Sequence, residues 1–348
     1  MLLLSGPNMA GNEWKYVKDC LDTGWVSSVG AYVDQFEKMS AEFAGSKYAV
    51  ATSSGTTALH ICLVMMGVNA GDYVITPNIT FIATCNSIKY TGADPILIDT
   101  DPATWQMDLD LLEQFLSEET EQRNGVCHYK KDGRRIPILM PVHVLGNMCD
   151  MDRLMALAKQ YNLTVIEDST EALGSYYKGK HAGSFGLMGT FSYNGNKIIT
   201  TGGGGMIVTD DEALARKAKH LTTQAKSDPF EYVHDEIGYN YRLVNVAAAM
   251  GVAQMEQLPG FIKRKQEVMA FYKNELLGVG DIKFQEVSAD VNANCWLPTI
   301  MTEKQKDVLK ILNDNKMQSR PFWVPMNQLS MFTNNIFYNK TNQSDFVY

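Results

Sequence analysis

The chain has 348 residues, of which 45% are hydrophobic, and its formal net charge at pH 7 is −8. This length and hydrophobic content allow a large core and predict one large domain plus a smaller one. The acidic balance argues against general binding to nucleic acid or acidic lipid, because phosphate groups are bound mainly by surplus Lys and Arg. The expected partner is a small molecule.

The sequence indicates no targeting segment, metal site or disulfide framework. Residues 1–7 lack a basic lead and are too short an apolar run for a signal peptide, and no later stretch stays apolar long enough to cross a bilayer. We therefore expect a cytoplasmic protein. The six cysteines have no paired C-x-x-C spacing, so we expect free thiols and no bound metal.

From about Tyr48 onward, strand-like runs alternate with helical periodicity, which is typical of a mainly parallel sheet covered by helices. Helices are predicted between the strands, for example over 56–67 and over 150–161, where Asp150 is the expected N-cap. A charged stretch over 117–135 predicts a solvated helix end and a hairpin. The predicted strands span 48–52, 73–76, 95–99, 136–142, 163–168, 190–193 and 206–209.

The pattern changes after Asn245. A long helical segment over 246–277 is followed by alternating strands and a helix near 303–315, while the polar segment 334–348 has no clear element. These features predict a large N-terminal α/β domain over residues 1–245. A small C-terminal α+β domain is predicted over residues 246–348.

The first candidate catalytic residue is Asp168, which follows Glu167 at the carboxyl end of an apolar strand. In open α/β sheets, ligands bind just beyond the ends of the strands. An Asp at such a place is more often a helix cap or a turn residue than a ligand. A catalytic role for Asp168 therefore depends on other residues.

A second candidate is Lys197, which stands in a turn between an apolar strand and the four glycines Gly202 to Gly205. Such a lysine is expected to be partly desolvated, which lowers its pKa and makes it a usable Schiff-base nucleophile. A surface lysine is the commoner alternative. The glycines are not a dinucleotide fingerprint, because that motif needs a following helix and here a strand is predicted instead.

A third feature is the hydroxyl-rich turn that contains Ser54, Gly55, Thr56 and Thr57, between a predicted strand and a predicted helix. Exposed N–H groups and the positive end of a helix favour an anion such as phosphate at this turn. A Ser/Thr helix cap without any ligand explains the same residues equally well.

Together with Ser192, these features resemble the DegT/DnrJ/EryC1/StrS family of sugar aminotransferases that depend on pyridoxal 5′-phosphate (PLP). The matching motifs occur in order along nearly the whole chain, so they are more specific as a set than any single motif. They are Ser5-Gly6-Pro7, Gly24-Trp25-Val26-Ser27, Thr80-Phe81, Glu167-Asp168-Ser169-Thr170-Glu171-Ala172, the Lys197 segment and Gly238-Tyr239-Asn240-Tyr241-Arg242.

The resemblance implies fold type I of the PLP-dependent transferases and a homodimer with its active sites at the subunit interface. By position, it implies that Lys197 holds PLP as a Schiff base and transfers protons, and that Asp168 pairs with the pyridinium nitrogen. Asn240 is implied to reach the phosphate bound by the neighbouring subunit. Further cofactor contacts are implied for Ser54, Gly55, Thr56, Phe81, Glu171 and Ser192.

The branch of the family that this chain resembles acts on nucleotide-linked 4-keto-6-deoxy sugars. The expected reaction moves an amino group from an amino acid, which we expect to be L-glutamate, to the 4-keto carbon, in lipopolysaccharide or other surface glycan synthesis. Trp25, Trp323 and Asn327 are the candidate sugar contacts. Relatives usually continue through another helix, so the small domain is expected to be trimmed or the gene product shortened.

Two alternatives remain from the sequence. A PLP-dependent sugar dehydratase of the same family has histidine in place of the Schiff-base lysine, and Lys197 argues against it. A non-catalytic relative with a regulatory role is expected to have defects in its ring or phosphate contacts, whereas Thr56, Asp168 and Ser192 are all present. His143, which follows a strand, is either a core histidine or part of the pocket wall.

Overall fold

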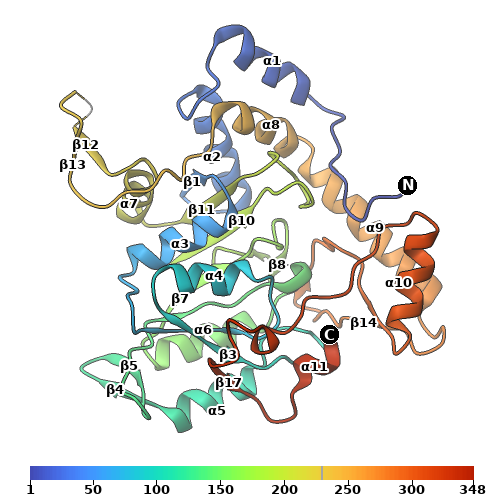
Figure 1. Cartoon of the computed structure of the whole chain (residues 1–348). Coiled ribbons are helices and arrows are strands. Elements are labelled where there is room, and N and C mark those ends of the chain that lie inside the picture. The colour runs from blue at the N-terminus through green and yellow to red at the C-terminus, as the bar shows by residue number, and fades with distance from the viewer. Residues whose placement is uncertain (229) are drawn as a thin grey trace.

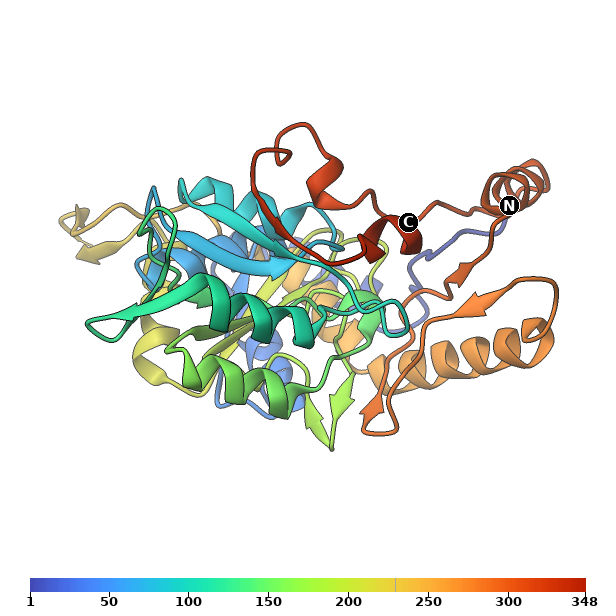
Figure 2. The same ribbon diagram turned by 90° about the horizontal axis from the view of Figure 1, so that it is seen from below.

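The computed structural model of the protein describes residues 1–228 and 230–348. Within these residues an eight-stranded sheet forms the centre, and helices lie on both of its faces (Figures 1 and 2). All neighbouring strands are parallel except in the two pairs that involve β11. In spatial order the strands are β1 (Tyr48–Thr52), β11 (Gly205–Thr209), β10 (Met188–Ser192), β7 (Thr164–Asp168), β6 (Ile138–Leu139), β2 (Tyr73–Pro77), β3 (Asp94–Ile98) and β17 (Ile336–Tyr338).

This arrangement confirms the predicted α/β class with a mainly parallel sheet. All five residues of β2 and of β11 are buried, as expected for strands that are covered on both faces. The seven strands predicted from the sequence are all present, although β6 is much shorter than the predicted 136–142. Pro137 and Pro141 flank β6, and neither offers an N–H group to a neighbouring strand.

The helices begin and end largely where the sequence signals place them. The carboxylate of Asp150 accepts a hydrogen bond from the N–H of Arg153 at 3.0 Å, so Asp150 caps α6 as predicted. Across the described ranges, none of the helices has the length and apolar character needed to span a bilayer. The helices are α1 (Glu13–Thr23), α2 (Ala31–Ala44), α3 (Gly55–Met65), α4 (Ala83–Tyr90), α5 (Leu109–Glu119), α6 (Met151–Gln160), α7 (Glu212–Thr222), α8 (Asn245–Met255), α9 (Leu258–Leu276), α10 (Gln305–Asp314) and α11 (Gln343–Val347).

Short strands complete the structure. The predicted hairpin over 117–135 is formed by β4 and β5, and the hairpin of β12 and β13 projects away from the body (Figure 1). The remaining short strands pair in two small sheets, β15–β8–β9 and β14–β16. These elements are β4 (Thr120–Arg123), β5 (Val126–Tyr129), β8 (Tyr176–Tyr177), β9 (Lys180–His181), β12 (Lys226–Asp228), β13 (Val233–His234), β14 (Lys283–Phe284), β15 (Val291–Asn292) and β16 (Ile300–Met301).

The prediction that residues 334–348 form no clear element is wrong. β17 extends the sheet beside β3, and α11 follows it. The buried carboxylate of Asp99 fixes this end by accepting hydrogen bonds from the N–H groups of Gln343 and Ser344, at 2.7 and 2.9 Å. The strand has only three residues, which is too short for a periodic sequence signal.

The hydrophobic core fills both faces of the sheet. Ile75 of β2 packs with Leu112 and Phe115 of α5 on one face. Its neighbour Val74 packs with Leu59 of α3 on the other, because successive side chains of a strand point to opposite faces. The strands are thereby held rigidly, and so are the loops at their carboxyl ends.

The C-terminal third of the chain contacts the rest of the chain at more than one place. β15 pairs with β8, β17 pairs with β3, and α8 packs against α1 and α2. A domain boundary between residues 245 and 246 therefore stays a prediction. What matters for function is that this part of the chain reaches over the carboxyl ends of the central strands.

Candidate active site

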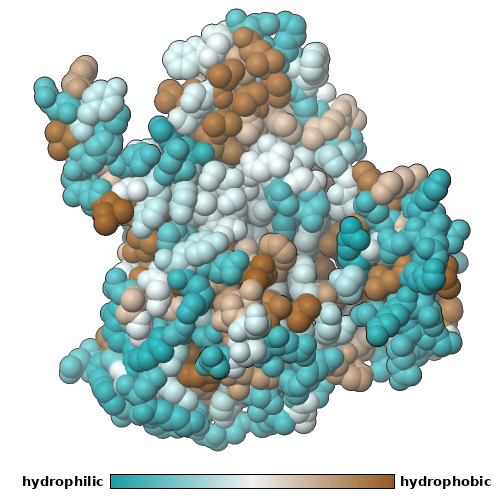
Figure 3. All heavy atoms as spheres, in the orientation of Figure 1, coloured by the Kyte–Doolittle hydropathy of each residue, from teal (hydrophilic) through white to brown (hydrophobic). Residues whose placement is uncertain are grey.

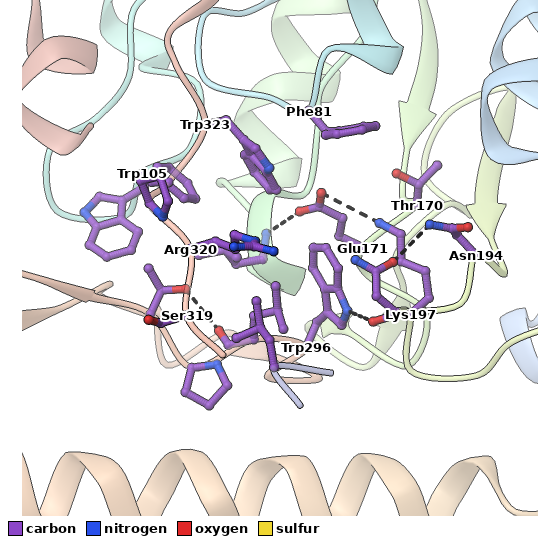
Figure 4. A pocket seen from close by; sticks show the side chains of 18 of the residues that line it. Phe81, Trp105, Thr170, Glu171, Asn194, Lys197, Trp296, Ser319, Arg320 and Trp323 are labelled. Carbon is purple, nitrogen blue, oxygen red and sulfur yellow. Dashed lines mark hydrogen bonds and ion pairs between the residues drawn. The ribbon is translucent and has the colours of Figure 1, made fainter. Parts of the chain in front are cut away.

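A cavity of about 580 Å³ lies at the carboxyl ends of β7 and β10. Its volume is in the range of small-molecule sites, and its position is where ligands bind in open α/β sheets. One wall comes from the loops after β1, β7 and β10. The opposite wall comes from the C-terminal third of the chain, including residues 296–302 and 319–323 (Figure 4).

Lys197 points into this cavity from the loop after β10 (Figure 4). Its Nζ lies 3.8 Å from Oε1 of Glu171 and 4.0 Å from the ring centroid of Trp296. Burial lowers the pKa of Lys197, while the negative charges of Glu171 and Asp168 act in the opposite direction. The geometry therefore favours an amine that loses its proton more easily than a surface lysine does.

The loop that carries Lys197 is fixed from two sides. The carbonyl of Asn196 accepts a hydrogen bond from Nε1–H of Trp296 at 2.7 Å and another from the hydroxyl of Ser5 at 2.8 Å. The N–H of Lys197 donates to the carbonyl of Asn194 at 3.0 Å. The N-terminal segment and the C-terminal third of the chain thus meet at this loop and hold its lysine in place.

Asp168 is the last residue of β7 and is almost fully buried. Its Oδ2 accepts a hydrogen bond from the hydroxyl of Thr84 at 2.6 Å, and its Oδ1 accepts one from the N–H of Thr170 at 3.2 Å. The hydroxyl of Thr84 also contacts that of Thr80 at 2.7 Å. These contacts fix the orientation of a buried carboxylate whose charge acts on Lys197.

The turn between β1 and α3 has the form of an anion site. Ser54 caps α3, because its Oγ accepts a hydrogen bond from the N–H of Thr57 at 3.1 Å. Within the described residues, the N–H groups of Gly55 and Thr56 have no acceptor. Ser192, at the end of β10, lies beside this turn on the cavity wall. The turn is thus both a helix cap and a set of free donors.

Glycines allow the turn to approach its neighbours closely. A Cβ atom at Gly55 would lie 2.9 Å from Cβ of Ser192 and 3.0 Å from Cγ2 of Thr170. A Cβ atom at Gly205, the last of the four consecutive glycines, would lie 2.3 Å from the carbonyl oxygen of Ser54. Close packing of β11 on the anion turn therefore explains the glycine at position 205.

Glu171 follows β7 and has only 2% of its side chain exposed. Its Oε2 accepts a hydrogen bond from the N–H of Leu145 at 2.8 Å, and its Oε1 faces Lys197 (Figure 4). Burial raises the pKa of Glu171 to about 7, although the charge of Lys197 and the Leu145 N–H group favour the ionised form.

The far side of the cavity carries aromatic rings and one arginine. The ring of Trp323 packs against Phe81 and Phe322, with centroid distances of 6.3 and 4.8 Å, and Trp105 packs against Phe322 at 5.8 Å. Arg320 points into the space between these rings and Lys197 (Figure 4). In the described part of the chain, Arg320 has no acidic partner within 4.0 Å.

Comparisons with known proteins agree with this site. Residues 7–347 match the model of the DegT/DnrJ/EryC1/StrS aminotransferase family. A GDP-perosamine synthase from Escherichia coli O157:H7 is 41% identical over 330 residues, which are 94% of this chain and 86% of that protein. The putative pyridoxal phosphate-dependent aminotransferase EpsN of Bacillus subtilis is 38% identical over 340 residues, which are 97% of this chain and 85% of EpsN.

The chain belongs to the DegT/DnrJ/EryC1/StrS aminotransferase family. The crystal structure of a family member from Brucella abortus has the same fold, with a TM-score of 0.88 at 23% identity over 97% of this chain and 88% of that one. These findings confirm the predicted family, the predicted aminotransferase class and the predicted cofactor, PLP.

The donor set of the cavity fits that cofactor. PLP carries an aldehyde, a ring nitrogen and a phosphate, and the cavity lining holds an amine and a turn with free N–H groups. The buried carboxylate of Asp168 lies outside the lining residues but close enough for its charge to act on Lys197. Phe81 lies on the cavity wall as a half-exposed ring, which is suitable for stacking on a flat heterocycle. None of these residues needs another reaction of the same family, such as dehydration of a sugar, to explain it.

Four predicted site residues lie outside the lining of this cavity within the single chain, and the buried Asp168 is one of them. Trp25 is exposed, and its carbonyl accepts a hydrogen bond from Asn245. Asn240 is also exposed and forms an isolated bridge with Thr223, which follows α7. Oδ1 of Asn327 accepts a hydrogen bond from Nδ2 of Asn78 at 2.8 Å, and the backbone N–H of Asn327 donates to Oδ1 of Asn78 at 2.9 Å. The cofactor and sugar roles of these residues stay predictions.

Two ionisable residues near Asp168, the acidic Glu167 and the basic His143, have structural roles. Glu167 is fully buried, and its carboxylate accepts hydrogen bonds from the N–H groups of Gly183, Phe185 and Gly186. Nε2 of His143 lies 2.9 Å from the same carboxylate. His143 is therefore a core histidine and does not line the cavity.

Sequence reasoning missed Leu145, Trp296 and Arg320. Trp296 and Leu145 have no local motif, since their roles come from contacts with residues far away in the chain. Arg320 is followed by Pro, Phe and Trp, but the role of the arginine appears only with the cavity.

Proposed function

We propose that the protein transfers an amino group from L-glutamate to the 4-keto carbon of a nucleotide-linked 4-keto-6-deoxy sugar. The observation that carries this proposal is one cavity that combines Lys197 and the anion turn with Arg320 and aromatic rings at the far wall. The buried carboxylate of Asp168 acts on Lys197 through its charge. The relatives named GDP-perosamine synthase support a nucleotide sugar as the substrate. Synthesis of surface glycans is the corresponding biological setting.

PLP, when bound, supplies an aldehyde and an electron-accepting ring, which together allow an amino group to leave one substrate and join another. Nζ of Lys197 would hold the aldehyde and, when free, would move protons at the reacting carbon as a general acid and base. The carboxylate of Asp168 would hold a proton on the ring nitrogen. The N–H groups of Gly55 and Thr56, with the hydroxyl of Ser192, would hold the phosphate.

Arg320 and the aromatic wall supply the rest of a nucleotide-sugar site. Lys197 and Arg320 are the only cationic side chains in the cavity lining across residues 1–228 and 230–348. Because Lys197 is committed to the cofactor, the guanidinium of Arg320 is the group available for a diphosphate, which it can bind in a bidentate manner. The rings of Phe322 and Trp323 offer flat surfaces for a sugar or a base.

The direct test is an assay of UDP-, GDP- and dTDP-linked 4-keto-6-deoxy sugars with L-glutamate. We expect one of these sugars to gain an amino group, measured as the mass of the product and as 2-oxoglutarate released. Lys197→Ala is expected to abolish this product, because no other amine lies at the same position. Absence of amination with all three sugars, or loss of water without amination, would contradict the proposal.

Arg320→Gln is expected to raise the KM for the nucleotide sugar roughly 10- to 100-fold, the effect of losing one hydrogen bond to a charged group. The reaction with glutamate alone is expected to keep its rate, since glutamate carries no diphosphate. Arg216→Gln is a matched control, because Arg216 pairs with Glu212 on the exposed face of α7. An unchanged KM in Arg320→Gln would exclude this role.

We also propose that the protein is a homodimer whose two sites lie at the subunit interface. Trp14 of α1 is 77% exposed, and apolar side chains gather over α1 and α8 (Figure 3). On the connection of β12 and β13 and just after it, Phe230 is 90% and Ile237 is 83% exposed. Exposed apolar surface of this extent is typical of a face that another protein covers. A second copy would also bring Asn240 toward a neighbouring phosphate.

Mixed dimers test the shared site. Asn240→Asp places a negative charge where a phosphate is expected, and Lys197→Ala removes the amine. If each site takes these residues from different subunits, a co-expressed and co-purified mixed dimer contains one intact site. Its activity is then expected to exceed the mean of the two parent homodimers. Activity equal to that mean, or a monomer in sedimentation, would contradict the proposal.

A further inference from the structure

We propose that Glu171 is the proton acceptor for Lys197. Its Oε1 takes the proton that the ammonium group must lose before the amine can act, and it returns the proton later in the cycle. This inference rests on the proposed function, because it assumes that Lys197 reacts as a free amine. It assigns to Glu171 a task beyond contact with the cofactor.

The two groups form an isolated pair. Oε1 of Glu171 and Nζ of Lys197 are 3.8 Å apart, and only 2% and 12% of the two side chains are exposed. The other side of Nζ faces the ring of Trp296 at 4.0 Å, which can neither take nor give a proton there. Asp168 is the one further carboxylate whose charge acts on both members of the pair. Within the described residues, Glu171 and not Asp168 is the carboxylate that lies within 4.0 Å of Nζ of Lys197.

The backbone near Glu171 is strained in order to hold this carboxylate. Leu145 has a φ of +60°, in the left-handed region that leucine rarely adopts, and Gly146 follows with a φ of +81°. This conformation presents the N–H of Leu145 to Oε2 of Glu171 at 2.8 Å. The hydroxyl of Ser175 fixes the turn by donating to the carbonyl of Gly146 at 2.6 Å. Strain of this kind is concentrated at functional sites.

With Oε2 held in this way, Oε1 is the oxygen left for Lys197. The side chain of Asn294 also holds the backbone of Glu171, because Nδ2 of Asn294 donates a hydrogen bond to the carbonyl of Glu171 at 2.8 Å. A carboxylate that served only to fill the core would not need a strained turn to fix one oxygen. The arrangement aims a single acceptor at a single amine.

Burial brings the proton affinities of the two groups closer together. The pKa of Glu171 is raised from 4.5 to about 7, and that of Lys197 is lowered from 10.5, in both cases chiefly by desolvation. An ion pair and a neutral pair therefore differ less in free energy here than they would in water. Transfer from Nζ to Oε1 turns an ammonium and a carboxylate into an amine and a carboxylic acid, with no other bond changed.

The alternative is that Glu171 is a fixed counterion that stays ionised and only stabilises the ammonium form of Lys197. The two roles differ in their consequences. Removal of a counterion lowers the pKa of Lys197, so that the reaction rate rises at a lower pH while its plateau value at high pH stays the same. Removal of a proton acceptor lowers the plateau itself, typically by about 10²-fold or more.

Infrared difference spectra of the cofactor-free protein, Glu171→Gln against the parent, test the protonation directly. We expect a protonated carboxyl band from Glu171 below about pH 7, fading as the pH rises further. Because the cation of Lys197 lowers the pKa of Glu171, the band is expected to persist to higher pH in Lys197→Met. A band that persists unchanged to pH 9 would mean a carboxyl group that is already protonated and unable to accept, and absence of the band down to pH 5 would mean a carboxylate that stays ionised; either result would overturn the proposal.

The kinetic test uses the holoenzyme and L-glutamate in single turnovers across pH. We expect the plateau rate of Glu171→Gln to fall about 10²-fold, and added formate to restore part of the rate in Glu171→Ala. Glu42→Gln, an exposed carboxylate of α2, is the matched control and should match the parent. A plateau within twofold of the parent would overturn the proposal. A parent without any half-reaction would instead contradict the proposed function, while leaving the infrared result informative.

Discussion

The buried amine of Lys197 is the group on which the rest of the site depends. Desolvation disfavours its charged form, and the carboxylates of Glu171 and Asp168 favour it. Desolvation and the two carboxylates can set the pKa of Lys197 only if the amine is held at a fixed place and kept away from water. The hydrogen bonds that Trp296 and Ser5 make to the preceding carbonyl provide this constraint, so both ends of the chain contribute to the reactivity of one side chain.

The parallel sheet explains why these groups meet. β7 and β10 are neighbours in the sheet, so Asp168 and the loop of Lys197 emerge at the same edge, although they are far apart in sequence. The anion turn joins them because β1 pairs with β11 and β11 with β10. Glycine at positions 55 and 205 lets these backbones come close enough for one small ligand to contact all of them.

The parts of the site that follow strands were predictable from sequence. Asp168, Lys197 and the turn at Ser54 each stand where a strand ends and a loop begins, and their order along the chain supports the family resemblance. The sheet was predictable for the same reason, since buried strands are apolar runs. β17 was not, because three residues at a sheet edge carry too little pattern.

The opposite wall of the cavity could not be derived from local pattern. The ring of Trp296 contacts Lys197, although the two residues are nearly 100 positions apart in the chain. The contribution of Leu145 comes from a backbone conformation that leucine rarely adopts. The role of Arg320 is inferred from its position in the cavity and from the absence of an acidic partner within the described residues. Such features depend on tertiary structure, and the fold alone does not determine the substrate.

The most direct test of the account is to locate the covalent attachment of the cofactor. The purified protein with bound PLP would be reduced with borohydride, digested and analysed by mass spectrometry. The account predicts the added mass of the reduced cofactor on the peptide that contains Lys197. An added mass on another lysine, such as Lys265, which donates a hydrogen bond to the carbonyl of Trp296, or no covalent adduct at all, would contradict it.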